Sequence, residues 1–265
     1  MPPSGLLGIV VATALGAARL LPVLWLVSPL GGPRLPATVR VGFAVLLALI
    51  ASPALAAAAG VEALAQLSAP QFVLLLGREI VVGFCLALVA ASAFRAAEVA
   101  GRLGDTLRGA NVAEILVPTA DERASPLGVL YLLLATVVFL QIGGVPRLVE
   151  ALLGSYRTLP IGGGLGEPAA RRAGLVVVAA SAKLIASGVA LAAPVVVAMW
   201  LTDLALGLIA RAAPSVPVYF VGLPLKGLLA IGVVLVGFAM LQNALAGGFA
   251  SWMQLFSQAV AAFRR

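Results

Sequence analysis

A lysine and a serine one helical turn apart form the pair in this chain that most resembles a catalytic centre. Lys183 and Ser187 are spaced i, i+4, so their side chains meet on one face of a helix. A lysine-activated serine would be a nucleophile for hydrolysis. No orienting third group accompanies the pair, and such a serine more often donates to a carbonyl of its own helix. We therefore expect no catalytic centre and keep an intramembrane Ser–Lys hydrolase as a rival hypothesis.

Two basic residues lie inside long apolar segments, at Arg19 and Lys183. A charge at such a position is costly in a membrane, so it usually faces a partner or a water-filled cavity. Snorkelling to the interface is the alternative. Arg19 lies well inside its segment, which favours a functional or partner-facing position. Asp203 is the acidic candidate for pairing, but it lies roughly 30 Å from Lys183 along one helix, so any pair must form across helices or subunits.

A stripe of alternating charges follows the third apolar segment. It consists of Arg95, Glu98, Arg102, Asp105 and Arg108. Spacings of three and four residues place these side chains on one side of a helix, within pairing distance of one another. The stripe is interpreted either as a solvated helix face or as the charged lining of a passage.

The segment after the stripe is unusually apolar for a loop. It begins at a glycine and ends at Pro118, and its residues include Gly109, Asn111, Val112, Ala113, Glu114, Ile115, Leu116 and Val117. Apolar loops are rarely left in water. The segment is expected either to fold into the interior of an assembly or to form a short amphipathic helix on a surface.

Composition predicts the elements that must carry these residues. The chain has 265 residues, of which 62% are hydrophobic and 10% are charged, and its mean hydropathy is +1.14. Soluble domains are about half apolar and about a quarter charged, so lipid or an apolar partner must cover the surplus. No two-residue alternation suggests strands. The fold class predicted is all-α, a multi-span membrane protein of helical hairpins that is part of a hetero-oligomeric helical assembly.

Six regions are candidates for membrane spans: 6–30, 41–61, 80–94, 127–142, 174–201 and 228–249. The first is expected to be a retained span, and Pro22 and Pro194 are expected to disturb their helices. Small residues at helical spacing, such as Ala87 with Ala91, would let helices approach closely. Residues 95–126 and 147–172 are expected to be the longer connectors, the second with a flexible glycine run at 161–166.

Several function classes are disfavoured by what the sequence contains. Cys85 is the single cysteine and there is no histidine, so a zinc site of the usual kind cannot be built and Cys85 is expected to be a small buried residue. The glycine run lacks a strand–turn–helix context for a nucleotide, so no cofactor is expected. The net charge of +7 is scattered, which favours lipid headgroups over nucleic acid. The loops on one side of the predicted spans carry eight Lys and Arg residues and those on the other side carry seven. The excess of positive charge that usually marks the cytoplasmic side is therefore too small to decide the orientation in the membrane.

Short fragments along the whole chain together resemble the FliR/SctT family of type III export-gate subunits. They are residues 39–44, 77–84, 97–101, 139–140, 143–144, 155–156, 159–160, 193–194, 201–207, 213–214 and 222–226. Gly143-Gly144 stands where flagellar members tend to have a histidine-containing turn. Tyr156 stands where they tend to have Phe. Both departures favour the injectisome branch, SctT.

The resemblance implies a role as a structural subunit that forms and seals the conduit for unfolded secreted protein across the bacterial inner membrane. It implies SctR/FliP-type and SctS/FliQ-type partners, with SctU/FlhB-type and SctV/FlhA-type subunits, and a position largely raised above the bilayer. It makes residues 109–119 a plug and divides the chain into 1–172, with four hydrophobic segments, and 173–265, a hairpin region similar to SctS/FliQ. Arg19, the stripe, Lys183, Asp203 and Lys226 would be lining or subunit contacts. A small-molecule secondary transporter or channel is the alternative.

Overall fold

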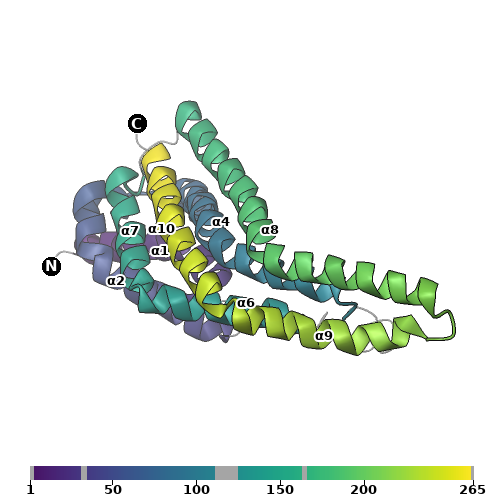
Figure 1. Ribbon diagram of the computed structural model, residues 1–265. Coiled ribbons are helices and arrows are strands. Elements are labelled where there is room, and N and C mark those ends of the chain that lie inside the picture. Colours follow the sequence, from purple (N-terminus) through teal and green to yellow (C-terminus); the bar gives the residue numbers. More distant parts are fainter. Residues whose placement is uncertain (1–2, 31–34, 111–124, 163–165, 264–265) are drawn as a thin grey trace. The chain divides into compact units, whose positions relative to one another are not determined.

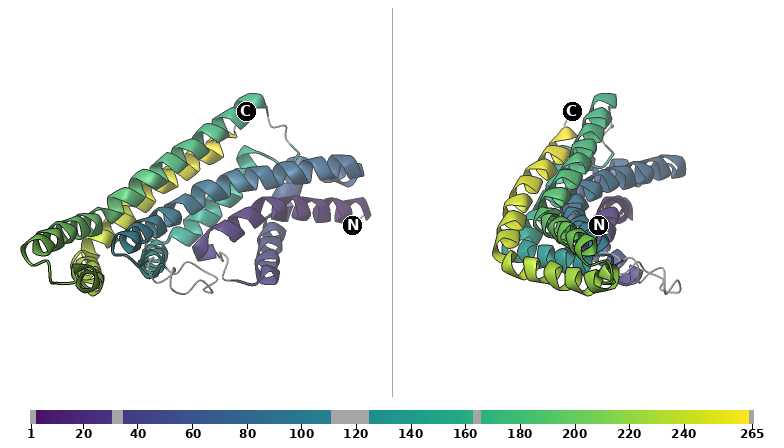
Figure 2. Two further views of the ribbon diagram at one scale, coloured as in Figure 1. Left: turned by 90° about the vertical axis from the view of Figure 1, so that its right-hand side faces the viewer. Right: turned by 45° about the vertical axis from the view of Figure 1, so that its right-hand side comes forward.

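Every regular element of the described structure is a helix. The computed structural model describes residues 3–30, 35–110, 125–162 and 166–263 (Figure 1), and Figure 2 presents the same helices from two further sides. The elements are α1 Pro3–Leu26, the 3₁₀ helix η1 Ser28–Leu30, α2 Ala37–Ala59, α3 Val61–Ala65, α4 Ala69–Leu107, α6 Pro126–Gln141, α7 Gly144–Thr158, α8 Glu167–Ala212, α9 Val218–Val236 and α10 Phe238–Ala262. The predicted all-α fold class is confirmed.

The described helices contain fewer spans than the six predicted. Four are long and apolar enough to cross a membrane: Gly5–Leu26 in α1, then α4, α8 and α9. The pair α6 and α7 would make a fifth if it is counted as one broken span. The predicted region 228–249 is wrong as a single span, because the helix breaks at Gly237 between α9 and α10. Glycine is a poor helix former, and a mean hydropathy does not register such a break.

The predicted connector 147–172 is also wrong, because most of it is helical. Helix α7 occupies Gly144–Thr158, and α8 begins at Glu167. Leu148, Leu152 and Tyr156 are buried at intervals of four residues, while the other faces of α7 carry charges. An amphipathic helix of this kind has a low average hydropathy, so a search for apolar runs passes over it.

The chain divides into two compact units that are each discontinuous in sequence. Unit 1 comprises Met1–Ala93, Phe139–Ala182 and Ala250–Arg265, and unit 2 comprises Phe94–Val138 and Lys183–Phe249. Helices α4, α6, α8 and α10 contribute residues to both units. The boundary at 172/173 that the resemblance implies falls inside unit 1, within α8.

Unit 1 is built around α1. Half of the most apolar stretch of this helix is buried, with Leu15, Leu20 and Val23 essentially inaccessible. Helix α4 lies directly against it, because a Cβ atom on Gly83 would fall 2.2 Å from the carbonyl oxygen of Arg19. Only a glycine permits that approach, so the two backbones touch at Gly83.

Unit 2 packs through small residues. A Cβ atom on Gly101 of α4 would lie 2.3 Å from the carbonyl oxygen of Leu127 in α6, and one on Gly188 of α8 would lie 3.2 Å from that of Ala96. The buried side of α4 in this unit is therefore its Ala/Gly side. This arrangement agrees with the expected role of small residues at helical spacing, since Gly188 and Ala192 are buried in unit 2. In unit 1, Ala87 and Ala91 are buried as well. Ala14, which has the same spacing to Ala18, is exposed.

The two spans of unit 2 are far more exposed than α1. The most apolar windows of α8 and α9 are 22% and 17% buried. Helix α9 returns alongside the C-terminal half of α8 after a short turn (Figure 1), and both helices keep large apolar side chains on their outer surfaces. A surface of this kind must meet lipid or other apolar helices.

Candidate functional site at the base of the 111–124 segment

The charged stripe ends where α4 ends, in a glycine-dependent C-cap. Gly109 has a φ of +80°, a left-handed conformation that glycine adopts without strain. The Ala110 N–H donates to the carbonyl of Asp105 at 3.0 Å, and the Gly109 N–H donates to that of Thr106 at 3.2 Å. These two bonds form a Schellman motif, which explains why a glycine stands at this position.

Of residues 109–119, which the resemblance makes a plug, the structure describes Gly109 and Ala110. Gly109 lies at the helix end, half-buried, and a Cβ atom there would meet Leu223 at 2.9 Å. The others lie outside the described residues: Asn111, Val112, Ala113, Glu114, Ile115, Leu116 and Val117. The candidate site therefore consists of the two described ends of that segment.

The chain resumes at the N-terminus of α6, which is capped twice. The Gly128 N–H donates to the Ser125 hydroxyl at 3.1 Å, as expected of an N-cap serine. One carboxylate oxygen of Asp105, Oδ2, accepts from the Ser125 hydroxyl at 2.6 Å and from the Leu127 N–H at 2.9 Å. Asp105 thus satisfies an otherwise unpaired N–H group of α6 from the end of α4.

The second carboxylate oxygen of Asp105 is used as well. Oδ1 accepts from Arg108 Nε at 2.7 Å, and Asp105 as a whole is 1% exposed. A buried carboxylate with three donors is well stabilised, and its negative charge also suits the positive end of the helix dipole of α6. We call Asp105, Arg108, Ser125 and the Leu127 N–H the Asp105 clasp. It holds the two ends of the 111–124 segment together.

The N-terminal part of the stripe is partly exposed to solvent. Glu98 accepts from Arg95 at 2.6 Å and from Arg102 at 2.7 Å. The two arginine side chains are 45% and 55% exposed, as expected of a solvated ladder of ion pairs. The solvated-face interpretation thus describes Arg95, Glu98 and Arg102 but not Asp105, which points inward. The alternation of charges along the sequence does not indicate which of these charged side chains points into the protein interior.

A further ion pair joins the two exposed helices α8 and α9 within unit 2. Lys226 of α9 pairs with Asp203 of α8, with the lysine side chain 16% and the aspartate side chain 51% exposed. The division of charges between the predicted spans puts Lys226 in a loop, but it lies inside α9. A Cβ atom on the next residue, Gly227, would lie 3.9 Å from Arg108 Nη1. The α8–α9 pair and the Asp105 clasp are therefore neighbours within unit 2.

Arg19 occupies a different environment, in the core of unit 1. Its Nε donates to Glu79 Oε2 at 2.6 Å, its Nη1 to the Ser155 hydroxyl at 3.3 Å and its Nη2 to the Leu159 carbonyl at 2.9 Å. Arg19 is 1% exposed and Glu79 is 0% exposed. The partner that Arg19 requires is thus in its own chain, and it is Glu79 rather than Asp203.

Tyr156 completes this buried cluster. The Arg19 guanidinium lies 4.4 Å from the centre of the Tyr156 ring, and the Tyr156 hydroxyl donates to the Gly16 carbonyl at 2.8 Å. Phe at this position would lack that hydrogen bond. Among the described residues, Glu79 Oε1 has no hydrogen-bond partner. In the sequence, Glu79 stands out only as part of a family-like fragment. An acid in a long apolar helix, with a glycine four residues later, is the signal that would have marked it.

The remaining predicted residues lie on α8 and α4. Lys183 and Ser187 are both half-buried on α8. Cys85, expected to be buried, is half-buried. No group of three or more metal-ligating side chains occurs in the described ranges.

The helices and their contacts define a multi-span helical membrane protein. The model of the family described as "Bacterial export proteins, family 1" matches residues 10–252, so the chain belongs to that family. The Yop proteins translocation protein T of Yersinia pestis is 34% identical over 191 residues, 72% of this chain and 71% of that protein. The secretion system apparatus protein SsaT of Salmonella typhimurium is 33% identical over 160 residues, 60% and 61% of the two chains. The flagellar biosynthetic protein FliR of Bacillus subtilis is 28% identical over 199 residues, 75% of each.

These similarities confirm the resemblance to the FliR/SctT family and place the chain in a type III secretion export apparatus. The two secretion-system relatives have higher identities than the flagellar one, which is consistent with the SctT branch. The names of these relatives describe a translocation protein, a secretion system apparatus protein and a flagellar biosynthetic protein, and none of them names an enzyme activity. The implied position above the bilayer has no support in the described residues.

Proposed function

We propose that this chain is a structural subunit that forms and seals the conduit for unfolded secreted protein across the bacterial inner membrane, without a catalytic centre of its own. The observation that carries the proposal is the Asp105 clasp. A buried carboxylate at the end of α4 binds the N-terminus of α6, and these two helix ends flank the stretch that includes the segment that the family resemblance makes a plug. Such an arrangement fits a segment that is held at its base while the rest of it changes partners.

The energetics of the clasp support a fixed base. Asp105 makes three charge-assisted hydrogen bonds in a nearly inaccessible site, where such bonds are stronger than in water. The plug itself would close by apolar packing and open when substrate or partner subunits compete for those contacts. In this proposal opening does not require α4 to separate from α6.

The surface of unit 2 supports the presence of partner subunits. The Asp203 carboxylate is half-exposed among exposed apolar side chains of α8 such as Trp200 and Leu204, and lipid would be a poor environment for it. We propose that SctR/FliP-type and SctS/FliQ-type helices cover this surface, with SctU/FlhB-type and SctV/FlhA-type subunits further out. Co-purification with two small helical membrane proteins in a fixed ratio tests this directly.

The transporter alternative gains no specific support. It needs charged groups that face a path near the membrane midplane. The strongest such candidate is Arg19, which is enclosed by Glu79, Ser155, Tyr156 and the Leu159 carbonyl. A charge engaged in this way is a structural element of unit 1.

The decisive experiment removes residues 111–117 from the otherwise intact chain. If they seal the conduit, cells expressing the variant leak small ions, measured as a collapse of membrane potential in a dye assay. A matched variant replaces the same seven positions with Gly and Ser, which keeps the length and removes the apolar side chains. It should leak as well, because closure depends on packing.

Asp105→Ala tests the base of the segment separately. Losing the carboxylate leaves the α6 N-terminus and Arg108 without their partner, a cost of about 2 kcal/mol by analogy with lost caps. We expect ion leakage at a level between the wild type and the deletion, with subunit co-purification retained. Normal membrane tightness in both the deletion and the Gly/Ser variant, with the complex assembled, would refute the sealing role.

A further inference from the structure

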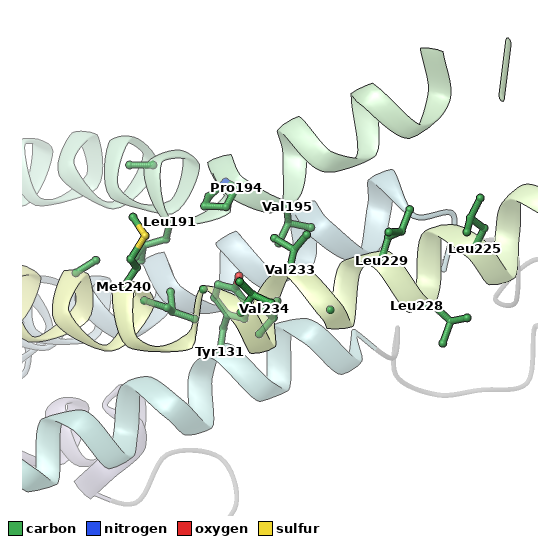
Figure 3. Close-up of a pocket in the computed structure, with 16 residues that line it drawn as sticks. Tyr131, Leu191, Pro194, Val195, Leu225, Leu228, Leu229, Val233, Val234 and Met240 are labelled. Atoms are coloured by element: carbon green, nitrogen blue, oxygen red, sulfur yellow. The ribbon is translucent and has the colours of Figure 1, made fainter. Parts of the chain in front are cut away.

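The turn between α1 and α2 in unit 1 carries a cation that lacks a partner. Chemistry of this kind identifies a ligand better than an apolar surface does. The pocket between α6, α8, α9 and α10 in unit 2 (Figure 3), for example, is lined by apolar side chains and the phenol of Tyr131. Such a wall does not select among lipid, a partner helix and another hydrophobic ligand. An unpaired buried cation, in contrast, calls for an anion.

The cation is Arg40, which is buried against Trp25 at the end of α1. Its guanidinium carbon lies 4.2 Å from the centre of the indole ring, and its Nε donates to the Leu35 carbonyl at 2.9 Å. Arg40 is 7% exposed, and its Nη1 has no hydrogen-bond partner among the described residues. The indole offsets part of the cost of burying the charge, but it leaves the N–H groups of Nη1 without an acceptor. Such buried donors are costly, so an acceptor is required that the described chain does not supply.

The N-terminus of α2 lies beside this guanidinium and offers further donors. The Arg40 side chain turns back along α2 to the carbonyl of Leu35, which precedes the helix. The Arg40 N–H donates to the Pro36 carbonyl at 3.2 Å, which closes the first turn. The N–H groups of Ala37 and Thr38 have no acceptor among the described residues, and both residues are exposed. Helix N-termini with free N–H groups bind anions, and here the unpartnered guanidinium is directed to the same place.

The surroundings of this turn are those of a membrane interface. Helix α1 is long and apolar enough to cross a membrane, and the apolar part of α2 begins at Ala37. Trp25, near the end of α1, is half-exposed, and the apolar side chains of Leu35 and Val39 are exposed beside the start of α2. Tryptophan is enriched where a span leaves the hydrocarbon, at the level of the lipid headgroups. The anion most abundant at that depth is the phosphate of a phospholipid.

We propose that Arg40 and the first turn of α2 bind the phosphate of one anionic phospholipid headgroup. Arg40 Nη1 and the N–H groups of Ala37 and Thr38 donate to the phosphate oxygens, and Trp25 holds the guanidinium in place. Arginine suits this position because its planar group keeps Nε on the Leu35 carbonyl while Nη1 donates elsewhere, which a lysine cannot do. The inference concerns unit 1 alone and does not depend on the conduit or on its seal.

The test measures lipid bound to the full chain, purified in detergent with any subunits that accompany it, by native mass spectrometry. Phosphatidylglycerol and phosphatidylethanolamine are titrated separately. The wild type should bind one phosphatidylglycerol about fivefold more tightly than phosphatidylethanolamine, because the site adds a positive charge to its hydrogen bonds. Inorganic phosphate at millimolar concentration should not displace the lipid, since the exposed apolar side chains beside the turn also hold its glycerol and acyl parts. Displacement by inorganic phosphate would identify a site for a free anion and overturn the proposal.

Three variants locate the site. Arg40→Gln should weaken phosphatidylglycerol binding about tenfold, the value of a charge-assisted hydrogen bond. Arg95→Gln removes a positive charge that is already paired with Glu98 and should leave this binding unchanged. Ala37→Pro removes one N–H group from the proposed site without touching Arg40, and proline is accepted in the first turn of a helix. It should weaken binding by a smaller factor, and it answers the question even if Arg40→Gln does not fold.

The remaining outcomes decide against the site. Equal binding of phosphatidylglycerol by the wild type, Arg40→Gln and Ala37→Pro would overturn the proposal. Equal weakening by Arg40→Gln and Arg95→Gln would also overturn it, because binding would then follow net charge. Loss of a partner subunit from Arg40→Gln with lipid binding unchanged would assign the guanidinium to an acidic side chain of that partner instead of a lipid.

Discussion

The two units place an ion pair inside apolar helices in opposite ways. In unit 1, Arg19 and Glu79 are 1% and 0% exposed, and Ser155, Leu159 and Tyr156 surround the arginine. In unit 2, Lys226 and Asp203 are 16% and 51% exposed on two spans that are themselves mostly uncovered. The difference teaches that unit 1 encloses its ion pair within the chain, whereas unit 2 leaves the carboxylate of its pair half-exposed.

The same contrast appears in how the helices touch. Helix α1 in unit 1 buries large side chains such as Leu15, Leu20 and Val23. Glycines bring backbones together in both units, at Gly83 in unit 1 and at Gly101 and Gly188 in unit 2, but α8 and α9 bury a much smaller share of their apolar windows than α1 does. Small-residue packing needs little side-chain area, so α8 and α9 keep their large apolar side chains for contacts outside the chain. We therefore expect unit 1 to be stable by itself and unit 2 to gain stability from lipid and partners.

Glu79→Ala should have the largest effect on this contrast. It leaves the Arg19 guanidinium buried without its counter-ion, which typically costs about 3–5 kcal/mol. Cys85 is the single cysteine of the chain and lies in the unit 1 part of α4, so the rate at which a maleimide dye labels it reports on opening of this unit. We expect labelling of the variant at a clearly lower temperature than in the wild type.

The control for Glu79→Ala removes both charges. Arg19→Met with Glu79→Leu replaces the buried pair with apolar side chains and should recover much of the loss, because a buried pair is often no more stable than hydrophobic residues of similar size. If the double variant were as unstable as Glu79→Ala, the isolated charge would not be the cause.

Gly101→Ala should have an intermediate effect, in unit 2. The new methyl group would lie 2.3 Å from the Leu127 carbonyl oxygen, so α4 and α6 must move apart at a cost of about 1–3 kcal/mol. Thermal loss of helical circular dichroism measures this, while Cys85 labelling should change little. Gly207→Ala is the matched control, because a Cβ atom at position 207 has no atom within 4 Å. Equal destabilisation by both substitutions would contradict the close-packing account.

Asp203→Asn should have the smallest effect on the isolated chain. An exposed pair contributes about 0–1 kcal/mol, and the amide keeps the shape of the side chain. The effect should appear instead in assembly, as weaker co-purification of the partner subunits. Arg95→Gln, which breaks a solvated pair with Glu98, serves as the comparison and should leave assembly intact. Unchanged assembly in Asp203→Asn would remove the argument that a neighbour covers this charge.

Some of the site could be predicted from the sequence because it depends on local order. The spacing of the stripe placed Glu98 within reach of Arg95 and Arg102, and those pairs form. Gly109 marked the start of the unusual segment, and it is the glycine that ends α4. The Asp105 clasp could not be predicted in this way, because Ser125 and Leu127 meet Asp105 only after the chain has left α4 and entered α6.

Composition and residue order by themselves determined that this chain is helical, belongs in a membrane and resembles an export-gate subunit. Those properties depend on average hydropathy, helical spacing and short fragments, all of which are readable along one dimension. Tertiary structure alone decided that Glu79 neutralises Arg19, that Lys226 meets Asp203, and that region 228–249 breaks at Gly237. The reason is physical: a buried charge requires a partner, but which residue supplies it depends on how closely two helices can approach, and here glycines such as Gly83 set that distance.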